Sequence, residues 1–379
     1  MLPARGGLSL ASALRIRKLR LMESKDENAK AGTPGPEQST GSGKGRWKRR
    51  CIALFLGLAV PFLVGEFAVR LTLGSPLSER LPIMEIQANA QRGWEMVPST
   101  THYTYQHAVH VNALGLRGAE IQPKQTGERR VLALGDSLIY GQGVGGDETV
   151  PAYLEGLLRA RGVMGTQNWS VVNAGHRAYD THQELGLLRE LGEEINADVI
   201  VLFWYWNDIN ERDMTGTFER LSASGPIFFD TGDKLEGMDE WRWRVKQFAR
   251  RSALVMALYD IFAQKTPEPQ DPGYVDAALL RLGDYLDEFV HRARKMGVAL
   301  YLAPIPDSGA LLGDHPGIEV RERAITLAKS KGIQVIDLVP GLRTLAEERG
   351  SLPILPFDGH YQPEGNAAIA EAVATVLDS

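Results

Sequence analysis

The sequence predicts an α/β fold whose central sheet has five parallel strands covered by helices on both faces. From residue 129 onwards, short apolar segments of strand length alternate with helical patterns. Apolar runs that are bounded by turn residues and separated by helices are typical of parallel strands buried on both faces. The expected strands are residues 131–134, 170–173, 199–203, 298–302 and 334–338, and the expected helices are residues 150–161, 182–194, 275–295, 321–330 and 363–377.

The composition indicates a globular protein with a separate basic N-terminal part. Of 379 residues, 44% are hydrophobic and 23% are charged, which is an ordinary balance. Residues 1–50 hold 12 basic and 4 acidic side chains, a net +8, whereas the remainder holds 30 and 43, a net −13. The acidic remainder argues against a catalytic region that binds nucleic acid. The single cysteine, Cys51, excludes an internal disulfide framework and a thiolate metal cluster.

Residues 1–46 are expected to form a disordered, basic cytoplasmic tail. The stretch 31–44 is rich in Gly, Pro, Ser and Thr, and such a composition cannot bury a core. Residues 8–21 could form a short basic amphipathic helix, which would be missing if translation began at Met22 rather than Met1.

A nearly uninterrupted apolar run from Cys51 to Val69 predicts one transmembrane helix, within an anchor segment of residues 47–73. About 20 apolar residues span the ~30 Å core of a bilayer. A basic cluster at residues 44–50 precedes the run directly, so the positive-inside rule leaves the N-terminus in the cytoplasm and places the rest of the chain outside. The expected location is therefore the cell membrane, with a single-pass signal anchor.

Three other interpretations of the apolar run fit less well. A cleaved signal peptide would need a small-residue cleavage site, and none is convincing. Arg49-Arg50 resembles a twin-arginine signal, but the residues after it fit poorly. A buried core helix would not directly adjoin a dense basic cluster. Glu66 and Arg70 lie four residues apart near the far end of the run, where they can pair.

The remaining chain is divided into a lead-in and a main domain with one insertion. Residues 74–128 are polar and interrupted by Pro and Gly, and we expect them to pack on the main domain, residues 129–379. At about residues 210–272 an insertion follows the end of a strand, where such excursions often form a lid or a substrate wall. Its aromatic and basic residues favour either an amphipathic helix on the sheet edge or contact with lipid headgroups.

A candidate nucleophile follows the first strand of the main domain. The strand ends at Gly135, and Asp136 and Ser137 stand at the turn. In an open parallel sheet, ligands bind in the crevice outside the carboxyl ends of the strands. A serine there can act as a nucleophile if a base, an orienting carboxylate and oxyanion donors are close. Taken alone, a serine in this place is more often a turn residue.

Three further segments at strand ends, or in the last strand–helix connection, could supply those groups. Asp358 and His360, separated by one glycine, can form a carboxylate–imidazole pair. Asn207, which precedes Asp208 after the strand at 199–203, can donate its amide to a developing oxyanion. Backbone amides of residues 173–179 could complete the oxyanion hole. Each segment alone could also be an ordinary turn, helix cap or loop.

The order and content of these four segments resemble the SGNH hydrolases, also called the GDSL family. Gly135-Asp136-Ser137-Leu138 resembles the first block, Asn207-Asp208 the third, and Asp358 with His360 the last. The resemblance implies a flavodoxin-like α/β/α sandwich and serine ester hydrolysis without a metal or cofactor. It implies Ser137 as nucleophile, His360 as general base and Asp358 as orienting acid. It also implies oxyanion donors at Ser137, Asn207 and either Ala178 or Gly175, with Asp136 and Asp208 in supporting roles.

Three positions depart from the family pattern. The oxyanion glycine of the second block falls at Ala178, with Gly175 three residues earlier. Because the donor is a backbone N–H, alanine can also supply it. The glycine two residues before the asparagine is Tyr205, and one residue rather than two separates Asp358 from His360. Membrane-anchored bacterial members with Asp-Gly-His share the last departure, and residues 112–118 also resemble theirs.

Other motifs in the chain point to no cofactor and no metal. Residues 141–146 fit GxGxxG, but six residues separate them from Leu134, and Asn173 rather than an acidic residue closes the next strand. There is no GxSxG elbow, which argues against an α/β-hydrolase fold. His176 and His182 lack a carboxylate cluster of metal-ligand spacing.

The sequence therefore predicts a membrane-anchored serine esterase acting on O-acyl esters of a glycan, a lipid or a small molecule. Two alternatives stay open. An O-acyltransferase would pass the acyl group to an extracytoplasmic polysaccharide, which requires water to be excluded from the acyl-enzyme. A catalytically degenerate SGNH domain would only bind a glycan. The sequence specifies neither the acyl group, nor the alcohol, nor the oligomeric state, nor whether the anchor is cleaved.

Overall fold

The computed structural model describes residues 43–233, 235–263, 271–307, 311 and 317–379. The chain divides into two compact units, Met1–Ala59 and Val60–Ser379. The predicted tail falls mainly on residues 1–42, which lie outside the described residues, as does the possible helix at 8–21. Residues 43–46 are helical, because helix α2 (Gly43–Leu73) begins before the expected start at Trp47.

Helix α2 has the length and composition of a membrane span. Its segment Arg46–Leu73 has a mean hydropathy of 2.2 in its most apolar window, none of which is buried. It is the one candidate span within the part of the chain that the structure describes. Arg70 donates from Nε to Glu66 Oε1 at 2.6 Å, so the two charged residues near its far end do form a pair.

The central sheet confirms the predicted five parallel strands. Its spatial order is β10-β9-β7-β5-β6, and every neighbouring pair is parallel. This is the flavodoxin-like order, in which the strand order reverses between β5 and β7. The strands are β5 (Arg129–Gly135), β6 (Trp169–Gly175), β7 (Val199–Trp204), β9 (Ala299–Pro304) and β10 (Gln334–Val335).

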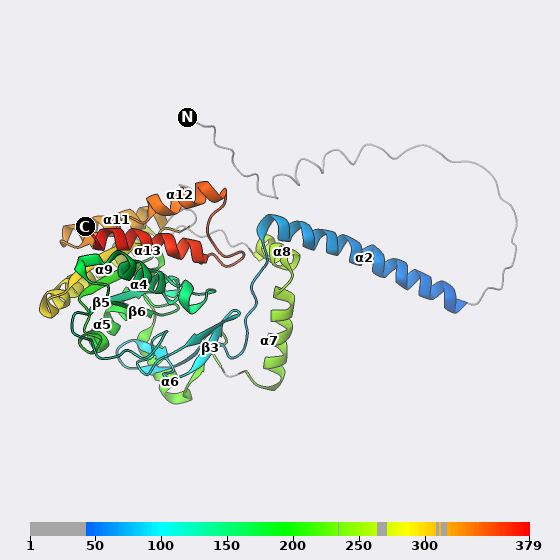
Figure 1. Cartoon of the computed structure of the whole chain (residues 1–379). Coiled ribbons are helices and arrows are strands. Elements are labelled where there is room, and N and C mark those ends of the chain that lie inside the picture. The colour runs from blue at the N-terminus through cyan, green and yellow to red at the C-terminus, as the bar shows by residue number, and fades with distance from the viewer. Residues whose placement is uncertain (1–42, 234, 264–270, 308–310, 312–316) are drawn as a thin grey trace, which may run out of the picture. The chain divides into compact units, whose positions relative to one another are not determined.

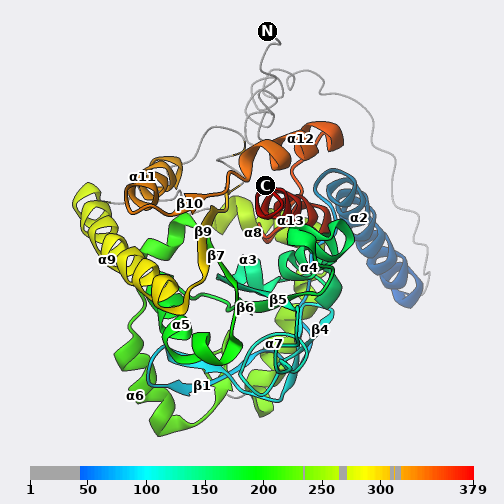
Figure 2. The ribbon, with the colours of Figure 1, turned by 60° about the vertical axis from the view of Figure 1, so that its left-hand side comes forward.

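Helices cover both faces of this sheet, so the three-layer sandwich is also confirmed (Figures 1 and 2). Successive side chains of β5 point to opposite faces. Leu132 and Leu134 join one apolar core with α5 (Thr181–Ile195), α9 (Pro272–Met296) and α11 (Gly317–Ser330). Val131 and Ala133 join the other with α4 (Val150–Arg161), α12 (Val339–Arg349) and α13 (Pro363–Leu377).

The last strand is shorter than the sequence predicts. Residues 334–338 were expected to be extended, but β10 ends at Val335. Asp337 Oδ1 accepts a hydrogen bond from Val339 N at 3.1 Å and so starts α12, which has a proline in its first turn. Proline is well placed there, because its missing N–H would be unpaired anyway. Helix α12 was not predicted.

The lead-in and the insertion meet in a small second sheet. Strands β1 (Glu85–Asn89), β2 (Gly93–Met96) and β8 (Ile227–Phe228) pair antiparallel in the order β2-β1-β8. Strands β3 (Thr101–Thr104) and β4 (His107–His110) form a hairpin. Buried lead-in residues such as Met84 and Trp94 belong to the same apolar core as Leu132. The insertion also contains helices α6 (Met214–Ser224), α7 (Gly237–Arg250) and α8 (Ala253–Ala263).

Short helices complete the described elements and hold the turns at the sheet edge. They are α3 (Ser137–Tyr140) and the 3₁₀ helices η1 (Gly146–Glu148), η2 (Val163–Gly165) and η3 (Trp206–Ile209). Gly175, at the end of β6, passes directly against the backbone of α3. A Cβ added at Gly175 would lie under 3.0 Å from Tyr140 N, Ile139 C and Tyr140 Cα. The absence of a side chain at Gly175 therefore sets the position of α3.

We expect Gly175→Ala to destabilise the protein by about 1–3 kcal/mol, because the backbone of α3 must move to admit the methyl group. Gly156→Ala is the matched control. Gly156 lies in α4, and an added Cβ there meets nothing within 4 Å. The control should be neutral or stabilising by up to about 1 kcal/mol. Urea unfolding of the full chain in detergent measures both, and equal midpoints for the two variants would contradict this account.

Candidate active site

The local structure displays Ser137 at the carboxyl edge of the sheet, beside the reversal between β5 and β7. Asp136 caps α3, its Oδ1 accepting from Leu138 N at 2.8 Å. Ser137 is the first residue of α3 and is half-buried, whereas Asp136 is buried. The strand end and the capped turn together fix the direction of the Ser137 side chain.

Ser137, His360 and Asp358 form one chain of hydrogen bonds. His360 Nδ1 lies 2.5 Å from Asp358 Oδ1, and His360 Nε2 lies 2.7 Å from Ser137 Oγ. An ionised carboxylate only accepts hydrogen bonds, so Nδ1 donates to it. Nε2 of the neutral ring is then an acceptor for the serine hydroxyl. In this arrangement the imidazole can take the serine proton, and the carboxylate can stabilise the imidazolium that forms.

Four donors surround the carboxylate of Asp358, whose side chain is 8% exposed. Oδ1 accepts from His360 Nδ1 and from His360 N, at 3.1 Å in the latter case. Oδ2 accepts from the hydroxyl of Tyr105 and from Gln142 Nε2, the latter at 3.2 Å. Burial alone would raise the pKa of Asp358, but the hydrogen bonds from His360 and Tyr105 and the imidazolium charge hold that pKa well below its usual range.

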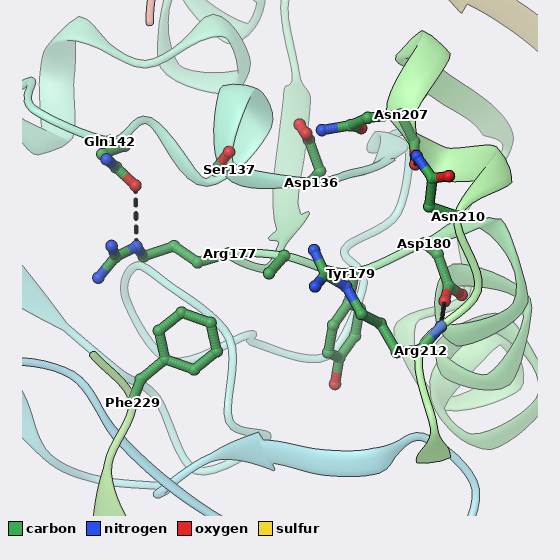
Figure 3. A pocket seen from close by; sticks show the side chains of 11 residues that line it. Asp136, Ser137, Gln142, Arg177, Tyr179, Asp180, Asn207, Asn210, Arg212 and Phe229 are labelled. Carbon is green, nitrogen blue, oxygen red and sulfur yellow. Dashed lines mark hydrogen bonds between the residues drawn. The ribbon is translucent and has the colours of Figure 1, made fainter. Parts of the chain in front are cut away.

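A second line of polar contacts connects Asp358 to the insertion. Gln142 Oε1 accepts from Arg177 Nε at 2.8 Å (Figure 3). This bond turns the amide N–H₂ of Gln142 toward Asp358. Arg177 also donates two hydrogen bonds to Asp230, both at 2.9 Å. Its guanidinium lies 5.3 Å from the centre of the Phe229 ring. The insertion therefore helps to orient the group that contacts Asp358.

The candidate oxyanion donors differ in their placement. Asn207 lies in η3 directly after β7, and it lines the same pocket as Ser137 and Ala178. Ala178 has φ = 58°, a left-handed conformation that favours glycine, which accounts for the family's glycine at this position. The N–H of Gly175 is already bonded to Asn173 Oδ1 at 3.0 Å. Of the two positions that the sequence left open, the geometry favours Ala178 as donor and gives Gly175 a packing role.

Buried carboxyl groups lie behind the candidate site. Asp208 Oδ2 accepts from Tyr205 N at 2.7 Å and so caps η3, the helix that carries Asn207. Asp208 Oδ1 and both carboxyl oxygens of Glu184 have no hydrogen-bond partner among the described residues. Burial raises the pKa of Asp136, and burial together with neighbouring carboxyls raises the pKa of Glu184 and Asp208 well above their ordinary values. These surroundings disfavour the charged forms of the three groups relative to carboxyl groups in water.

The pocket beside Ser137 is small and polar, with a volume of about 220 Å³. Asn210, Arg212 and Phe229 reach it from the insertion, as Figure 3 shows. The other lining residues are Asp136, Ser137, Gln142, Arg177, Ala178, Tyr179, Asp180 and Asn207. Within the described ranges, no group of three or more His, Cys, Asp or Glu side chains is arranged to hold a metal ion. His176 instead stacks on Tyr179, and His182 stacks on Tyr285.

Sequence reasoning did not identify Tyr105, Gln142, Arg177 or Glu184. Tyr105 belongs to the lead-in and has φ = 52° in the turn between β3 and β4. Nothing in the sequence indicates that this turn reaches residue 358. Gln142 lies in the Gly-rich loop. Its polar side chain stands among glycines, and this feature of the sequence could have identified it as a residue of the site. Glu184 interrupts an otherwise apolar helix face, since Leu185, Leu187 and Leu188 around it are buried.

A doubly wound sandwich with a serine after its first strand and an Asp-Gly-His segment before its last helix defines an SGNH-type hydrolase. The model of the GDSL-like lipase/acylhydrolase family matches residues 133–368. Because this range is more than half of the chain, the protein belongs to that family.

Several solved structures are similar to this chain at low sequence identity. A lipase/acylhydrolase from Enterococcus faecalis is 13% identical, with a TM-score of 0.39, and the match covers 66% of this chain and 95% of that one. The acetyl xylan esterase AlAXEase is 12% identical, with a TM-score of 0.38 and coverage of 65% and 98%. TesA is 16% identical, with a TM-score of 0.39 and coverage of 66% and 98%. The comparison with curated proteins found no match.

We expect Tyr105→Phe to lower turnover of an activated acetyl ester about tenfold, because one hydrogen bond to a charged acceptor is worth ~1.5–3 kcal/mol. Losing this donor also raises the pKa of Asp358, and a more basic carboxylate stabilises the imidazolium form of His360 that it contacts, so the acid limb of the activity profile should move to higher pH. A kcat/KM profile against pH measures both effects. Tyr103→Phe is the control, because the Tyr103 ring contacts Arg80 and not Asp358. An unchanged profile in Tyr105→Phe would contradict the assignment.

We expect Glu184→Gln to flatten the dependence of stability on pH. A carboxyl with a raised pKa in the folded state binds its proton more tightly there than in the unfolded chain. The wild type should therefore lose stability as pH rises above the ordinary value of 4.5, and the variant should lose less. Between about pH 5 and about pH 8 the difference should be of order 1 kcal/mol or more, measured by urea unfolding.

Glu193→Gln, on the same helix, is the matched control for Glu184→Gln. Its carboxylate is 80% exposed and pairs with Lys295. This variant should keep the pH dependence of the wild type. If Glu184→Gln changed the free energy of unfolding by the same amount at both pH values, the surroundings of Glu184 would not raise its pKa, and the account would be wrong.

Proposed function

We propose that this protein is a membrane-anchored serine ester hydrolase that removes short acyl groups from a polar alcohol outside the cytoplasm. The observation that carries the proposal is the hydrogen-bonded chain Ser137–His360–Asp358 beside a pocket that Asn207 and Ala178 also line. Family membership supports hydrolase chemistry. The residue roles, the substrate class and the location are the proposed parts.

In the proposed reaction, Ser137 Oγ attacks the ester carbonyl while His360 Nε2 takes the hydroxyl proton. The backbone N–H groups of Ser137 and Ala178 and the side-chain amide of Asn207 stabilise the developing oxyanion. His360 then gives its proton to the departing alcohol. A water molecule, deprotonated by His360, hydrolyses the acyl-enzyme and restores the serine.

The pocket supports a short acyl group and a polar alcohol. Pockets for drug-sized ligands are typically ~300–1,000 Å³ and mostly apolar. The present pocket has about 220 Å³, and apart from Ala178, Tyr179 and Phe229 its lining side chains are hydroxyl, amide, carboxyl or guanidinium groups. A long fatty acyl chain would lack apolar cover there. Arg212 and Asn210 lie where they can bind hydroxyl or acidic groups of the alcohol.

Hydrolysis is favoured over acyl transfer and over binding without catalysis. The side chain of His360 is 20% exposed and Asn207 is exposed, so water can reach the acyl-enzyme. A transferase would have to exclude that water. A domain that only binds glycans has no need for a serine, an imidazole and a carboxylate in hydrogen-bond contact.

Helix α2 and the basic residues in its first turns support the proposed location. An apolar helix with a basic cluster at its start is expected to leave its N-terminus in the cytoplasm. The catalytic domain then acts on the other side of the membrane.

We expect a fluorophosphonate probe to label the wild type but neither Ser137→Ala nor His360→Ala. Acetyl esters should be hydrolysed with a kcat/KM on the order of tenfold or more above octanoyl esters of the same alcohol. Ser224→Ala, which removes an exposed hydroxyl in α6, is the control and should keep both activities. Both measurements use the full chain in detergent.

Labelling that persists in Ser137→Ala would reject the nucleophile. A preference for octanoyl esters would reject the short-acyl assignment. Formation of acyl-oligosaccharide faster than free acid, with an oligosaccharide added, would favour the transferase instead.

A further inference from the structure

The surface of α7 carries an exposed apolar stripe. Met238, Trp241, Val245 and Phe248 are between 46% and 73% exposed. Their spacing of three, four and three residues places them on one side of the helix. A helix on the surface of a soluble domain normally turns such a stripe toward the core and exposes its polar side.

Helix α8 also exposes an apolar face to solvent. Val255, Leu258, Tyr259 and Phe262 also share one helix face, and they are between 38% and 84% exposed. The opposite face, with Ala253 and Met256, is buried. Scattered exposed apolar side chains are common, but two consecutive helices that each expose an apolar stripe are typical of an interaction surface. We call the eight exposed side chains of α7 and α8 the apolar surface.

Helix α8 is attached directly to the end of the candidate membrane span. The carboxylate of Glu66 in α2 accepts from Ser252 Oγ at 2.6 Å, Ala253 N at 3.0 Å and Leu254 N at 2.9 Å, and so caps α8. Arg70 Nη2 donates to Arg251 O at 2.5 Å. A Cβ added at Gly65 would lie 3.1 Å from Leu254 Cδ2, so the two helices touch.

The apolar surface thus lies beside apolar residues of α2 that are themselves exposed. Phe62, Leu63 and Phe67, in the last turns of α2, are at least 43% exposed. If α2 spans a bilayer, these side chains face lipid, and α8 starts at the same level. Figure 1 shows α7 and α8 beside this end of α2, on the side of the catalytic domain away from α9.

The charges around the apolar surface suit anionic lipid headgroups. From Gly237 to Arg251 there are five basic residues, Arg242, Arg244, Lys246, Arg250 and Arg251, and two acidic ones, Asp239 and Glu240. This net +3 stands in a region, residues 51–379, with a net charge of −13. Trp and Tyr, which α7 and α8 expose at positions 241 and 259, are favoured at membrane–water interfaces.

We propose that α7 and α8 rest in the lipid headgroup region as a second membrane contact, with their apolar surface in the outer part of the bilayer core. An interfacial helix buries one apolar face and keeps basic residues at the headgroups. Phe229 and Asp230, which border or orient the active-site pocket, lie shortly before α7 in the chain. The second contact therefore holds the pocket wall at a fixed height and tilt above the membrane. This inference rests on the proposal that α2 spans the bilayer.

The test uses single cysteines in the full chain, which the sequence makes simple because Cys51 is the only native one. In a Cys51→Ser background, cysteine replaces Trp241, Tyr259, Leu58 or Leu280, and each carries an environment-sensitive nitrobenzoxadiazole dye. Leu58 reports on α2, and Leu280, an exposed leucine of α9, is the matched control. The proteins are placed in vesicles of phosphatidylcholine and phosphatidylglycerol, with or without nitroxide-labelled lipid. Fluorophosphonate labelling, or circular dichroism if that probe fails on the wild type, checks that each variant is folded.

We expect blue-shifted emission and quenching by nitroxide lipid at positions 241, 259 and 58, and neither at position 280. Omitting phosphatidylglycerol should weaken quenching at 241 more than at 58. Quenching at 58 without quenching at 241 and 259 would overturn the second contact and leave the anchor intact. Quenching at 259 but not at 58 would keep the surface contact and reject the span. A blue shift at 241 and 259 that rises with protein density and is insensitive to nitroxide lipid would mean that a second copy covers the surface, which overturns the proposal.

Discussion

The carboxylate of Asp358 is the point on which the rest of the candidate site depends. Its four hydrogen-bond donors come from the C-terminal segment, from the lead-in and from the loop after α3. A buried carboxylate stays ionised only when hydrogen bonds and positive charge replace the lost water. The ionised state fixes the tautomer of His360, and the tautomer decides whether Nε2 can accept the proton of Ser137. Segments that lie far from the serine in sequence therefore control its chemistry.

The sheet supplies the second constraint, because the serine and the asparagine stand after neighbouring strands at the reversal of strand order. Asp136 caps the short helix of Ser137 and Asp208 caps that of Asn207, each through an oxygen that accepts a backbone N–H. Both caps are buried near Glu184, where like charges would repel. Burial and this repulsion together raise the pKa of Glu184 and Asp208, so that protonation of either group relieves the repulsion.

The patterns that could be recognised from the sequence are local. The five strands, Ser137 after β5 and the Asp-Gly-His segment before α13 each depend on neighbours within a few residues. The contacts that the sequence could not predict are long-range: Tyr105 lies 253 residues from Asp358, and Gln142 lies 216 residues from it. The choice between Gly175 and Ala178 likewise depended on tertiary packing, since only the closeness of β6 to α3 explains the glycine. Helix α12 was not predicted, and the Pro340-Gly341 pair at its start is a dipeptide typical of turns.

Glu66 shows how tertiary structure can change the meaning of a charged residue in an apolar helix. By sequence alone, Glu66 and Arg70 are a pair near the end of a span. In the structure the carboxylate also caps the start of α8, a helix that exposes an apolar face. A charged group at this depth is costly unless its hydrogen bonds are satisfied, and here Ser252, two backbone amides and Arg70 satisfy them. One ionic cluster thus connects helix α2 to the insertion, and the insertion in turn reaches the pocket through the ion pair of Asp230 with Arg177. If α2 is the membrane anchor that we propose, a single tether would let the rest of the chain rotate above the bilayer, whereas this connection leads from α2 to the residues that orient Asp358.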